Sequence, residues 1–227
     1  MLIGIDMAER LSGCHVAVLG LGGVGSWCAE ALARSGIGRL TIADNDCFSY
    51  TNINRQLGAL HSTVGLSKVS VTEKRLRDIN PDIELRSMEY RYEASSSHLF
   101  FDSRYDFIAD AIDTVSAKLH LIENAHNLGI PIISALGTGN KLDPTRLEIA
   151  DISETSVCPL ARVMRREMKK RGIFRHTVVY SREEPISPQQ EEEPPPGRRS
   201  VPGSVVWVPA AAGLIMASYV VKTLIKP

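Results

Sequence analysis

A glycine-rich segment close to the amino terminus limits the possible fold more than any other feature of this sequence. Gly20, Gly22, Gly23 and Gly25 lie between a short apolar run and a helical pattern over residues 26–35. Glycines at such a junction allow the backbone to approach a phosphate, and the amino end of the helix supplies oriented N–H groups and partial positive charge. The segment predicts a strand, a phosphate-binding turn and a helix. It does not separate NAD, FAD and ATP sites.

The alternation of strands and helices continues along the chain. Strands that alternate with helices of about 10–15 residues are typical of a doubly wound, mostly parallel α/β sheet. We expect a Rossmann-like nucleotide-binding region over residues 1–139 and, after a change of pattern, a C-terminal extension of strands and helices over residues 140–227. The predicted strands cover residues 15–20, 40–44, 84–90, 107–111, 130–135, 147–152 and 177–180, and the predicted helices cover residues 26–35, 64–79, 117–128 and 159–171.

Two segments near the carboxyl end differ from the rest in composition. Residues 182–203 contain an acidic, proline-rich run that cannot bury enough apolar surface to fold, so we expect a mobile loop there. Residues 205–225 are the most apolar stretch, interrupted by Pro209 and Lys222. The helical part after Pro209 is shorter than the roughly 20 residues that a bilayer crossing needs. We therefore expect a buried helix and no membrane association.

Charge and cysteine usage exclude several classes of protein. The 26 Lys and Arg residues balance 26 Asp and Glu residues, so any nucleic-acid site must be a local patch. Four cysteines without a Cys-x-x-Cys pair argue against a disulfide framework or a structural zinc site and are typical of a reducing compartment. The first residues show no signal-peptide pattern, so we expect a cytoplasmic protein.

Charged residues after the glycine turn favour ATP over a dinucleotide. Asp44, at the end of the second predicted strand, is at the distance expected for a ribose-binding carboxylate, which a dehydrogenase would share. Arg55 and Lys68 have no such use in a dehydrogenase, whereas they suit a triphosphate whose oxygens gain charge during cleavage. Asp113 follows the fourth strand, where a carboxylate would hold Mg²⁺ against the phosphates. The alternative is that Arg55 and Lys68 are surface charges and Asp113 caps a helix.

These motifs resemble the E1-like adenylating enzymes, which use ATP to activate carboxylates. The matching segments are Gly20-x-Gly22-Gly23-x-Gly25, Asp44-x-Asp46, Thr51-Asn52-x-Asn54-Arg55-Gln56, Val64-Gly65-x-x-Lys68 and Asp113. Within this family the chain is most similar to the tRNA threonylcarbamoyladenosine dehydratase branch. That similarity rests on Gly137-Thr138-Gly139, Lys141-Leu142-Asp143-Pro144-Thr145, the segment Pro159-Leu160-Ala161-Arg162-Val163-Met164-Arg165-Arg166, and Pro202-Gly203-Ser204.

The resemblance implies an ATP-dependent and Mg²⁺-dependent dehydration, that is, cyclisation, of N6-threonylcarbamoyladenosine at position 37 of tRNA through an acyl-adenylate. It also implies a homodimer, to which residues 205–225 would contribute packing, and it leaves a sulfur-relay protein as a possible partner. The implied catalytic residues are Arg55, Lys68 and Asp113, with Asp113 as the metal ligand. The implied cofactor-binding residues are Gly20, Gly22, Gly23, Gly25, Asp44, Asp46, Asn52, Asn54, Arg55, Gln56 and Lys68.

A predicted helix in the C-terminal part carries a high density of positive charge. Such density is what an RNA phosphate backbone attracts, although a solvated helix face has the same composition. We expect an RNA-binding surface, with one acidic residue, Glu167, among its members. The positive residues are Arg162, Arg165, Arg166, Lys169, Lys170, Arg171 and Arg175.

Three other interpretations explain less of the sequence. An adenylyltransferase that activates the terminal carboxylate of a ubiquitin-like sulfur-carrier protein would normally show Cys-x-x-Cys zinc pairs. A dehydrogenase explains only the glycine turn and Asp44, and a non-catalytic RNA-binding module leaves Arg55, Lys68 and Asp113 without a role. Cys158 stands where this branch tends to have an acidic residue. Many E1-like enzymes carry acyl groups on a cysteine, but no histidine or second cysteine flanks Cys158, so we expect no catalytic role for it.

Overall fold

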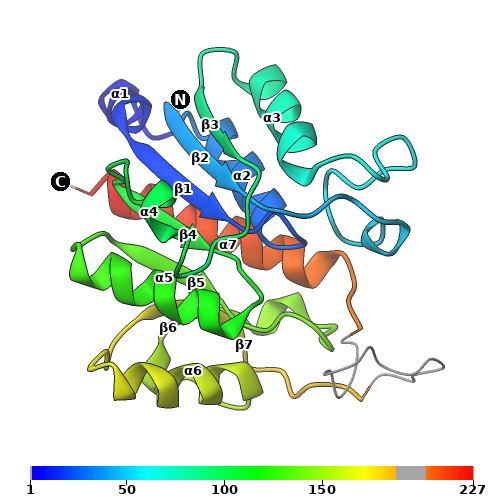
Figure 1. The fold of residues 1–227 in the computed structure, drawn as a ribbon, viewed down its shortest axis with the longest axis vertical. Coiled ribbons are helices and arrows are strands. Elements are labelled where there is room, and N and C mark those ends of the chain that lie inside the picture. Colours follow the sequence, from blue (N-terminus) through cyan, green and yellow to red (C-terminus); the bar gives the residue numbers. More distant parts are fainter. Residues whose placement is uncertain (1, 188–202, 227) are drawn as a thin grey trace.

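The computed structural model describes residues 2–187 and 203–226, and it contains one seven-stranded sheet of order β3-β2-β1-β4-β5-β7-β6 (Figure 1). All neighbouring strands are parallel except β6 and β7, which are antiparallel. The predicted doubly wound, mostly parallel α/β sheet is confirmed. The strands are β1 (His15–Leu19), β2 (Arg39–Ala43), β3 (Glu84–Met88), β4 (Phe107–Asp110), β5 (Ile132–Ala135), β6 (Leu147–Asp151) and β7 (Thr177–Ser181).

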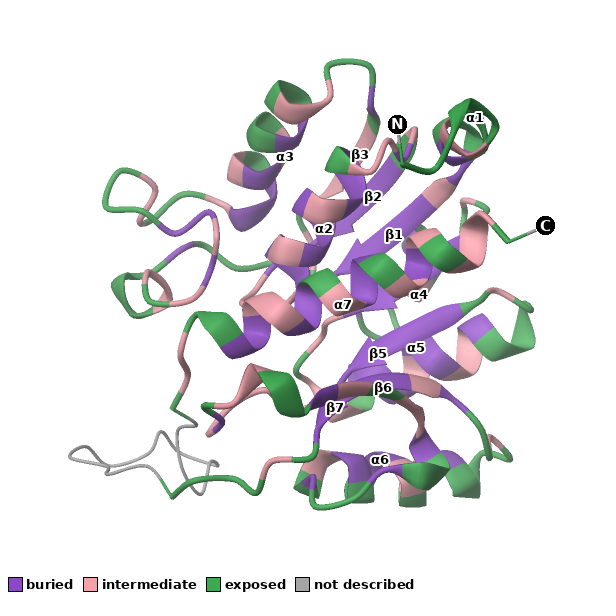
Figure 2. Cartoon of the chain, turned by 180° about the vertical axis from the view of Figure 1, so that it is seen from behind, coloured by how far each residue is buried: buried purple, intermediate pink, exposed green. Residues whose placement is uncertain are grey.

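Helices cover both faces of the sheet, because successive side chains of each strand point to opposite faces. Val16 and Val18 of β1 join one core with α2, α3 and α7, whereas Ala17 and Leu19 join the other core with α4, α5 and α6 (Figures 1 and 2). The helices are α1 (Ile5–Gly13), α2 (Gly25–Arg34), α3 (Lys68–Ile79), α4 (Ser97–Phe100), α5 (Val115–Asn127), α6 (Pro159–Lys170) and α7 (Trp207–Leu224).

The turn between β1 and α2 needs glycine for steric reasons. Gly20 has a φ of 87°, which L side chains rarely adopt, and a Cβ there would lie 2.6 Å from the carbonyl oxygen of Ala111. A Cβ at Gly25 would lie 1.7 Å from the carbonyl oxygen of Gly20. The glycine turn is therefore packed directly against the chain that leaves β4. Since β1 pairs with both β2 and β4, the strand order reverses here, where open α/β sheets bind their ligands.

The boundaries of α3 differ from the prediction, which began that helix at residue 64. The helix begins at Lys68, with Ser67 as its N-cap accepting a hydrogen bond from the backbone N–H of Ser70. Gly65 has a φ of 86°, outside the range of a right-handed helix. The short helices α1 and α4 were not predicted, because nine and four residues carry too little periodicity to distinguish them from loops.

The C-terminal part extends the same sheet. β7 pairs in parallel with β5, and β6 closes that edge as an antiparallel strand. α7 packs against α2 so closely that a Cβ at Gly213 would lie 2.3 Å from the carbonyl oxygen of Val24. Of the predicted loop over residues 182–203, residues 188–202 lie outside the described residues.

One helix in the described part of the chain, α7, is long and apolar enough to cross a membrane, with a mean hydropathy of 1.3 over 18 residues. Its side chains at Val208, Ala212, Met216 and Val220 are buried in the core that α7 shares with α2. This placement agrees with the expected buried helix.

Candidate functional site

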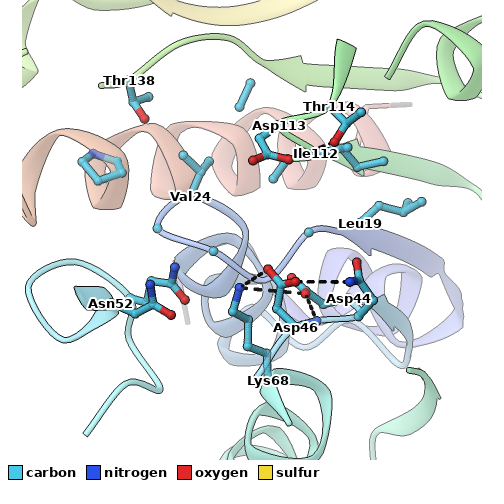
Figure 3. Close-up of a pocket in the computed structure, with 18 of the residues that line it drawn as sticks. Leu19, Val24, Asp44, Asp46, Asn52, Lys68, Ile112, Asp113, Thr114 and Thr138 are labelled. Carbon is cyan, nitrogen blue, oxygen red and sulfur yellow. Dashed lines mark hydrogen bonds and ion pairs between the residues drawn. The ribbon is translucent and has the colours of Figure 1, made fainter. Parts of the chain in front are cut away.

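A cavity of about 540 Å³ opens at the carboxyl ends of β1, β2, β4 and β5, where the strand order reverses. Most of the residues that the sequence assigned to ATP meet here, although they come from five separate segments of the chain (Figure 3). Its lining includes Gly20, Gly22, Gly23, Asp44, Asp46, Asn52, Arg55, Gln56, Lys68 and Asp113. Gly25 and Asn54 do not line the cavity.

Asp44 is held in the wall of this cavity by backbone donors. Its Oδ2 accepts a hydrogen bond from the N–H of Leu21 in the glycine turn at 2.6 Å, and its Oδ1 accepts one from the N–H of Asp46 at 2.8 Å. Two hydrogen bonds to separate oxygens leave the carboxylate little freedom to rotate. Asp44 therefore ties the end of β2 to the glycine turn and presents a fixed acceptor to the cavity.

Lys68 is the first residue of α3 and is buried against the same wall. Its Nζ lies 2.8 Å from Asp46 Oδ2 and 3.9 Å from Asp44 Oδ1, and Figure 3 shows these three side chains together. Its backbone N–H donates to the carbonyl oxygen of Asp46 at 3.0 Å, which fixes the start of α3 beside the cavity. The result is a positive charge held in place by two carboxylates.

The segment that carries Arg55 is shaped by local hydrogen bonds. The 3₁₀ turn Tyr50–Asn52 has a capping box in which Ser49 and Asn52 bond each other's backbone. Arg55 donates from its Nη1 to the carbonyl oxygen of Thr51 at 2.7 Å and to Asn54 Oδ1 at 2.9 Å. Burial lowers the pKa of the Arg55 guanidinium; arginine nevertheless stays charged, because its ordinary pKa is above about 12.

The two residues on either side of Arg55, Asn54 and Gln56, differ in their position relative to the cavity. Asn54 does not line the cavity; it donates from Nδ2 to the carbonyl oxygen of Ser204 at 2.9 Å and so joins this segment to the chain that enters α7. Gln56 lines the cavity and is buried, and its Oε1 has no hydrogen-bond partner among the described residues. A buried acceptor without a partner is costly, so Gln56 offers a group for a ligand to satisfy.

Asp113 lies across the cavity from Lys68, in the turn between β4 and α5 (Figure 3). Within the described part of the chain its carboxylate accepts one hydrogen bond, from Thr114 Oγ1 at 3.3 Å. The described residues contain no cluster of three or more potential metal ligands. Mg²⁺ is commonly held by one or two carboxylates together with phosphates and water, so the exposed Asp113 carboxylate fits this ion in the presence of a polyphosphate.

Sequence reasoning missed part of the lining. Tyr90, Arg91 and Tyr92 follow β3 and enter the cavity beside Asp44 and Asp46. Their position after a strand was the available signal, because the carboxyl ends of parallel strands meet at one edge of a sheet. Further lining comes from segments that the family resemblance had named without a role, at Thr138, Leu160 and Ser204, and from Pro209.

Cys158 is buried behind the cavity and does not line it. It is the N-cap of α6, and its Sγ accepts from the N–H of Ala161 at 3.5 Å. A Cβ built at Gly137 in the cavity wall would lie 4.0 Å from this Sγ. The position gives Cys158 a structural use at the start of α6.

The predicted basic helix is α6, and its charges do not all face solvent. Arg165 is half-buried and donates from Nη1 to the carbonyl oxygens of Thr155 at 2.8 Å and Ile152 at 3.3 Å. Glu167 pairs with three of the other cations, Arg166, Lys170 and Arg171, at 3.1, 2.9 and 3.7 Å. These partners, Lys170 first, hold the pKa of Glu167 below its usual range.

Arg162, Lys169 and Arg175, the remaining cations of this group, are exposed. They form no ion pair with any residue in 2–187 or 203–226. Arg162, Arg166 and Lys169 share one face of α6, since they are spaced by four and three residues. The exposed surface is thus smaller than the sequence suggested, and Arg165 does not belong to it.

Comparison with known proteins finds relatives that align with nearly the whole chain. A tRNA threonylcarbamoyladenosine dehydratase from Bacillus subtilis is 43% identical over 235 residues, covering 100% of this chain and 92% of that relative. The crystal structure of Escherichia coli tRNA N6-threonylcarbamoyladenosine dehydratase in complex with AMP has a TM-score of 0.89 at 33% identity, covering 98% of this chain and 90% of that one. An adenylyltransferase and sulfurtransferase UBA4 from Vanderwaltozyma polyspora is 33% identical over 61% of this chain but only 31% of its own length. The model of the ThiF family matches residues 1–227, and the chain belongs to the ThiF family.

Proposed function

We propose that this protein is an ATP-dependent tRNA threonylcarbamoyladenosine dehydratase. The observation that carries the proposal is the cavity itself, in which a glycine turn, the fixed carboxylate of Asp44 and the cations Arg55 and Lys68 surround one space opposite Asp113. A relative with that activity in its name aligns with the whole of this chain. The related Escherichia coli enzyme has been crystallised with AMP and with ATP.

The reaction has two steps. A carboxylate is first joined to the α-phosphate of ATP, and the resulting AMP group is then displaced by ring closure. An oxygen of the threonyl carboxylate of N6-threonylcarbamoyladenosine attacks the α-phosphorus, and pyrophosphate leaves. The neighbouring carbamoyl group then attacks the activated carbonyl, a ring closes, and AMP leaves with the carboxylate oxygen. Ring closure within one nucleoside has a large effective-concentration advantage, so the protein mainly has to bind, orient and neutralise charge.

The residues in the cavity divide these tasks. The N–H groups of the glycine turn at the start of α2 bind phosphate, and Asp44 accepts from the ribose hydroxyls. Arg55 and Lys68 neutralise the polyphosphate as its charge shifts toward the leaving pyrophosphate, and the Asn52 amide donates a hydrogen bond to it. Asp113 would hold Mg²⁺ against the phosphates, and the ion would supply further neutralisation of that charge.

The position of α6 beside this cavity supports the proposed RNA surface. Leu160, in the first turn of α6, lines the cavity, and the helix runs away from it for about 18 Å at 1.5 Å per residue. Arg162, Arg166 and Lys169 form a basic row along that length. A tRNA stem bound to this row would bring a nucleotide at its end toward the cavity.

The same proposal includes the wider organisation of the enzyme. Residues 1–139 form the ATP-binding region, residues 140–227 supply the substrate and dimer region, and the protein works in the cytoplasm as a homodimer. The exposed side chains Trp207 and Leu214 of α7, both about half exposed, support a packing role for that helix between subunits. A sulfur-relay protein remains a candidate partner.

Nucleoside analysis of tRNA tests the activity directly. Purified protein, ATP, Mg²⁺ and tRNA that carries N6-threonylcarbamoyladenosine are expected to yield the cyclic nucleoside, one water lighter, with one AMP formed per ring. The matched control is tRNA without that modification, which should yield no AMP. AMP formation only with a sulfur-carrier protein that ends in Gly-Gly would support the adenylyltransferase alternative and contradict the proposal.

A further inference from the structure

Four buried polar side chains lie directly behind the cavity, and we call them the Asp110 network. Asp110 ends β4, Lys118 lies in α5, Ser134 lies in β5 and His176 precedes β7. Asp110, Lys118 and Ser134 are fully buried and His176 is 4% exposed. The ends of β4 and β5, the helix α5 and the segment before β7 are therefore joined at one point under the site.

Hydrogen bonds connect all four side chains. Asp110 Oδ2 accepts from Lys118 Nζ at 2.7 Å and from Ser134 Oγ at 2.6 Å. Since the Ser134 hydroxyl hydrogen goes to Asp110, the 2.8 Å contact between Ser134 Oγ and His176 Nε2 requires an N–H on that ring nitrogen. Burial lowers the pKa of His176 to about 3, so the ring is neutral and its Nδ1 carries no proton.

The second oxygen of Asp110 acts on the turn that carries Asp113. Asp110 Oδ1 accepts from the backbone N–H of Ile112 at 3.0 Å, immediately before Asp113. Ala111, the residue between Asp110 and Ile112, packs against the glycine turn: a Cβ at Gly20 would lie 2.6 Å from the Ala111 carbonyl oxygen. The network therefore bonds the turn that carries Asp113, and it lies one residue from Ala111, which packs against the glycine turn.

Stability alone does not account for such a network. A buried ion pair loses about as much from desolvation as it gains from attraction, and apolar replacements of similar volume are often neutral or stabilising. What a buried, hydrogen-bonded ion pair does supply is a defined geometry. We propose that the Asp110 network is a positioning device that sets the Asp113 carboxylate relative to the glycine turn, so that Mg²⁺ and ATP bind together.

The test measures how much Mg²⁺ strengthens ATP binding, and it rests on the proposed role of Asp113. Calorimetry gives the dissociation constant of ATP once in the presence of Mg²⁺ and once in the presence of a chelator. The magnesium gain is the constant with chelator divided by the constant with Mg²⁺. The variant Asp110→Asn combined with Lys118→Met removes both charges and keeps the side chains similar in size. Its magnesium gain is expected to fall by about 10-fold to 100-fold, as for other groups that orient metal ligands. Its AMP affinity is expected to stay at the wild-type value.

Three controls separate positioning from stability. Glu30→Gln breaks a different ion pair, with Arg75 at 2.6 Å between α2 and α3, and is expected to lower the melting temperature without changing the magnesium gain. Ser134→Ala, a smaller change, is expected to lower the gain less than the double variant. In the background of Asp113→Asn, the double variant is expected to lower the gain no further, because both changes act on one carboxylate.

Some outcomes overturn the inference. An unchanged magnesium gain in the folded double variant, or in Ser134→Ala if the double variant does not fold, contradicts it. Full additivity with Asp113→Asn also contradicts it. These measurements use ATP, AMP and Mg²⁺ only, so they remain informative if the tRNA assay shows that the proposed activity is wrong.

Discussion

At the scale of single residues, the cavity depends on charges that are held before any ligand arrives. Lys68 is kept in place by Asp44 and Asp46, and Arg55 by the carbonyl oxygen of Thr51 and the side chain of Asn54. A preorganised charge needs little rearrangement when a phosphate gains charge, which is why such groups stabilise transition states strongly.

Removing either cation should therefore slow the reaction more than it weakens binding. Lys68→Ala and Arg55→Ala are each expected to lower the rate of AMP formation by about 10²-fold to 10³-fold, the usual effect of removing one preorganised donor. Steady-state measurement of AMP with saturating ATP gives this rate. Lys74→Ala, an exposed lysine on the same helix as Lys68, is the control and should keep the wild-type rate. Wild-type rates in both site variants would show that these cations lie outside the reacting centre.

A buried histidine gives a second expectation at this scale, concerning pH. The pKa of His176 is lowered from 6.5 to about 3, chiefly by burial and then by His126 and Lys118. The unfolded chain therefore binds a proton at His176 below pH 6.5 that the folded chain does not, and stability is lost as the pH falls from 6.5 toward 3. The loss from this group is at most about 1.4 kcal/mol per pH unit.

Denaturant titrations between pH 4 and 7 check this expectation. His176→Gln cannot take up the proton, so its free energy of unfolding should fall less steeply with pH than that of the wild type. His98→Gln, a change at an exposed histidine of α4, should leave the wild-type slope in place. Equal slopes for wild type and His176→Gln would mean that His176 is protonated in the folded protein.

At the scale of elements, α6 combines structural and exposed cations in one helix. Arg165 donates to carbonyl oxygens of the turn before the helix, whereas Arg162, Arg166 and Lys169 form the outer row. Periodicity predicted the helix itself, but it did not distinguish the inward arginine from its neighbours, because that depends on a turn ten residues away.

Reversing the outer row should weaken tRNA binding without changing ATP affinity. The triple variant Arg162→Glu, Arg166→Glu and Lys169→Glu removes up to three phosphate contacts. The negative slope of log affinity against log salt should therefore become flatter by about 2. Filter binding across a salt series measures this slope. The control triple variant Arg10→Glu, Lys74→Glu and Arg104→Glu changes the net charge equally on other surfaces and should keep the slope. If the two triple variants behave alike, α6 is not the RNA surface.

At the scale of the whole molecule, the C-terminal part completes the fold begun by the first 139 residues. β7 and β6 extend the same sheet, and α7 packs against α2. This packing brings Pro209, in the first turn of α7, beside the glycine turn. A Cβ at Gly23 would lie 3.2 Å from the Cβ of Pro209. The wall that would bind phosphate is thus supported by residues almost 190 positions away in the sequence.

The sequence alone determined the features that depend on neighbouring residues. The glycine turn and the alternation of strands and helices follow from local sterics and periodicity, and both were predicted. The start of α3 was misplaced because Gly65 and the Ser67 cap outweighed an apolar pattern. Tertiary structure decided what lies together across strands: Tyr90 and Arg91 in the cavity, Cys158 behind its wall, Arg165 turned inward and Lys118 paired with Asp110. Such contacts join residues on different elements, and burial decides them only when the whole sheet has formed.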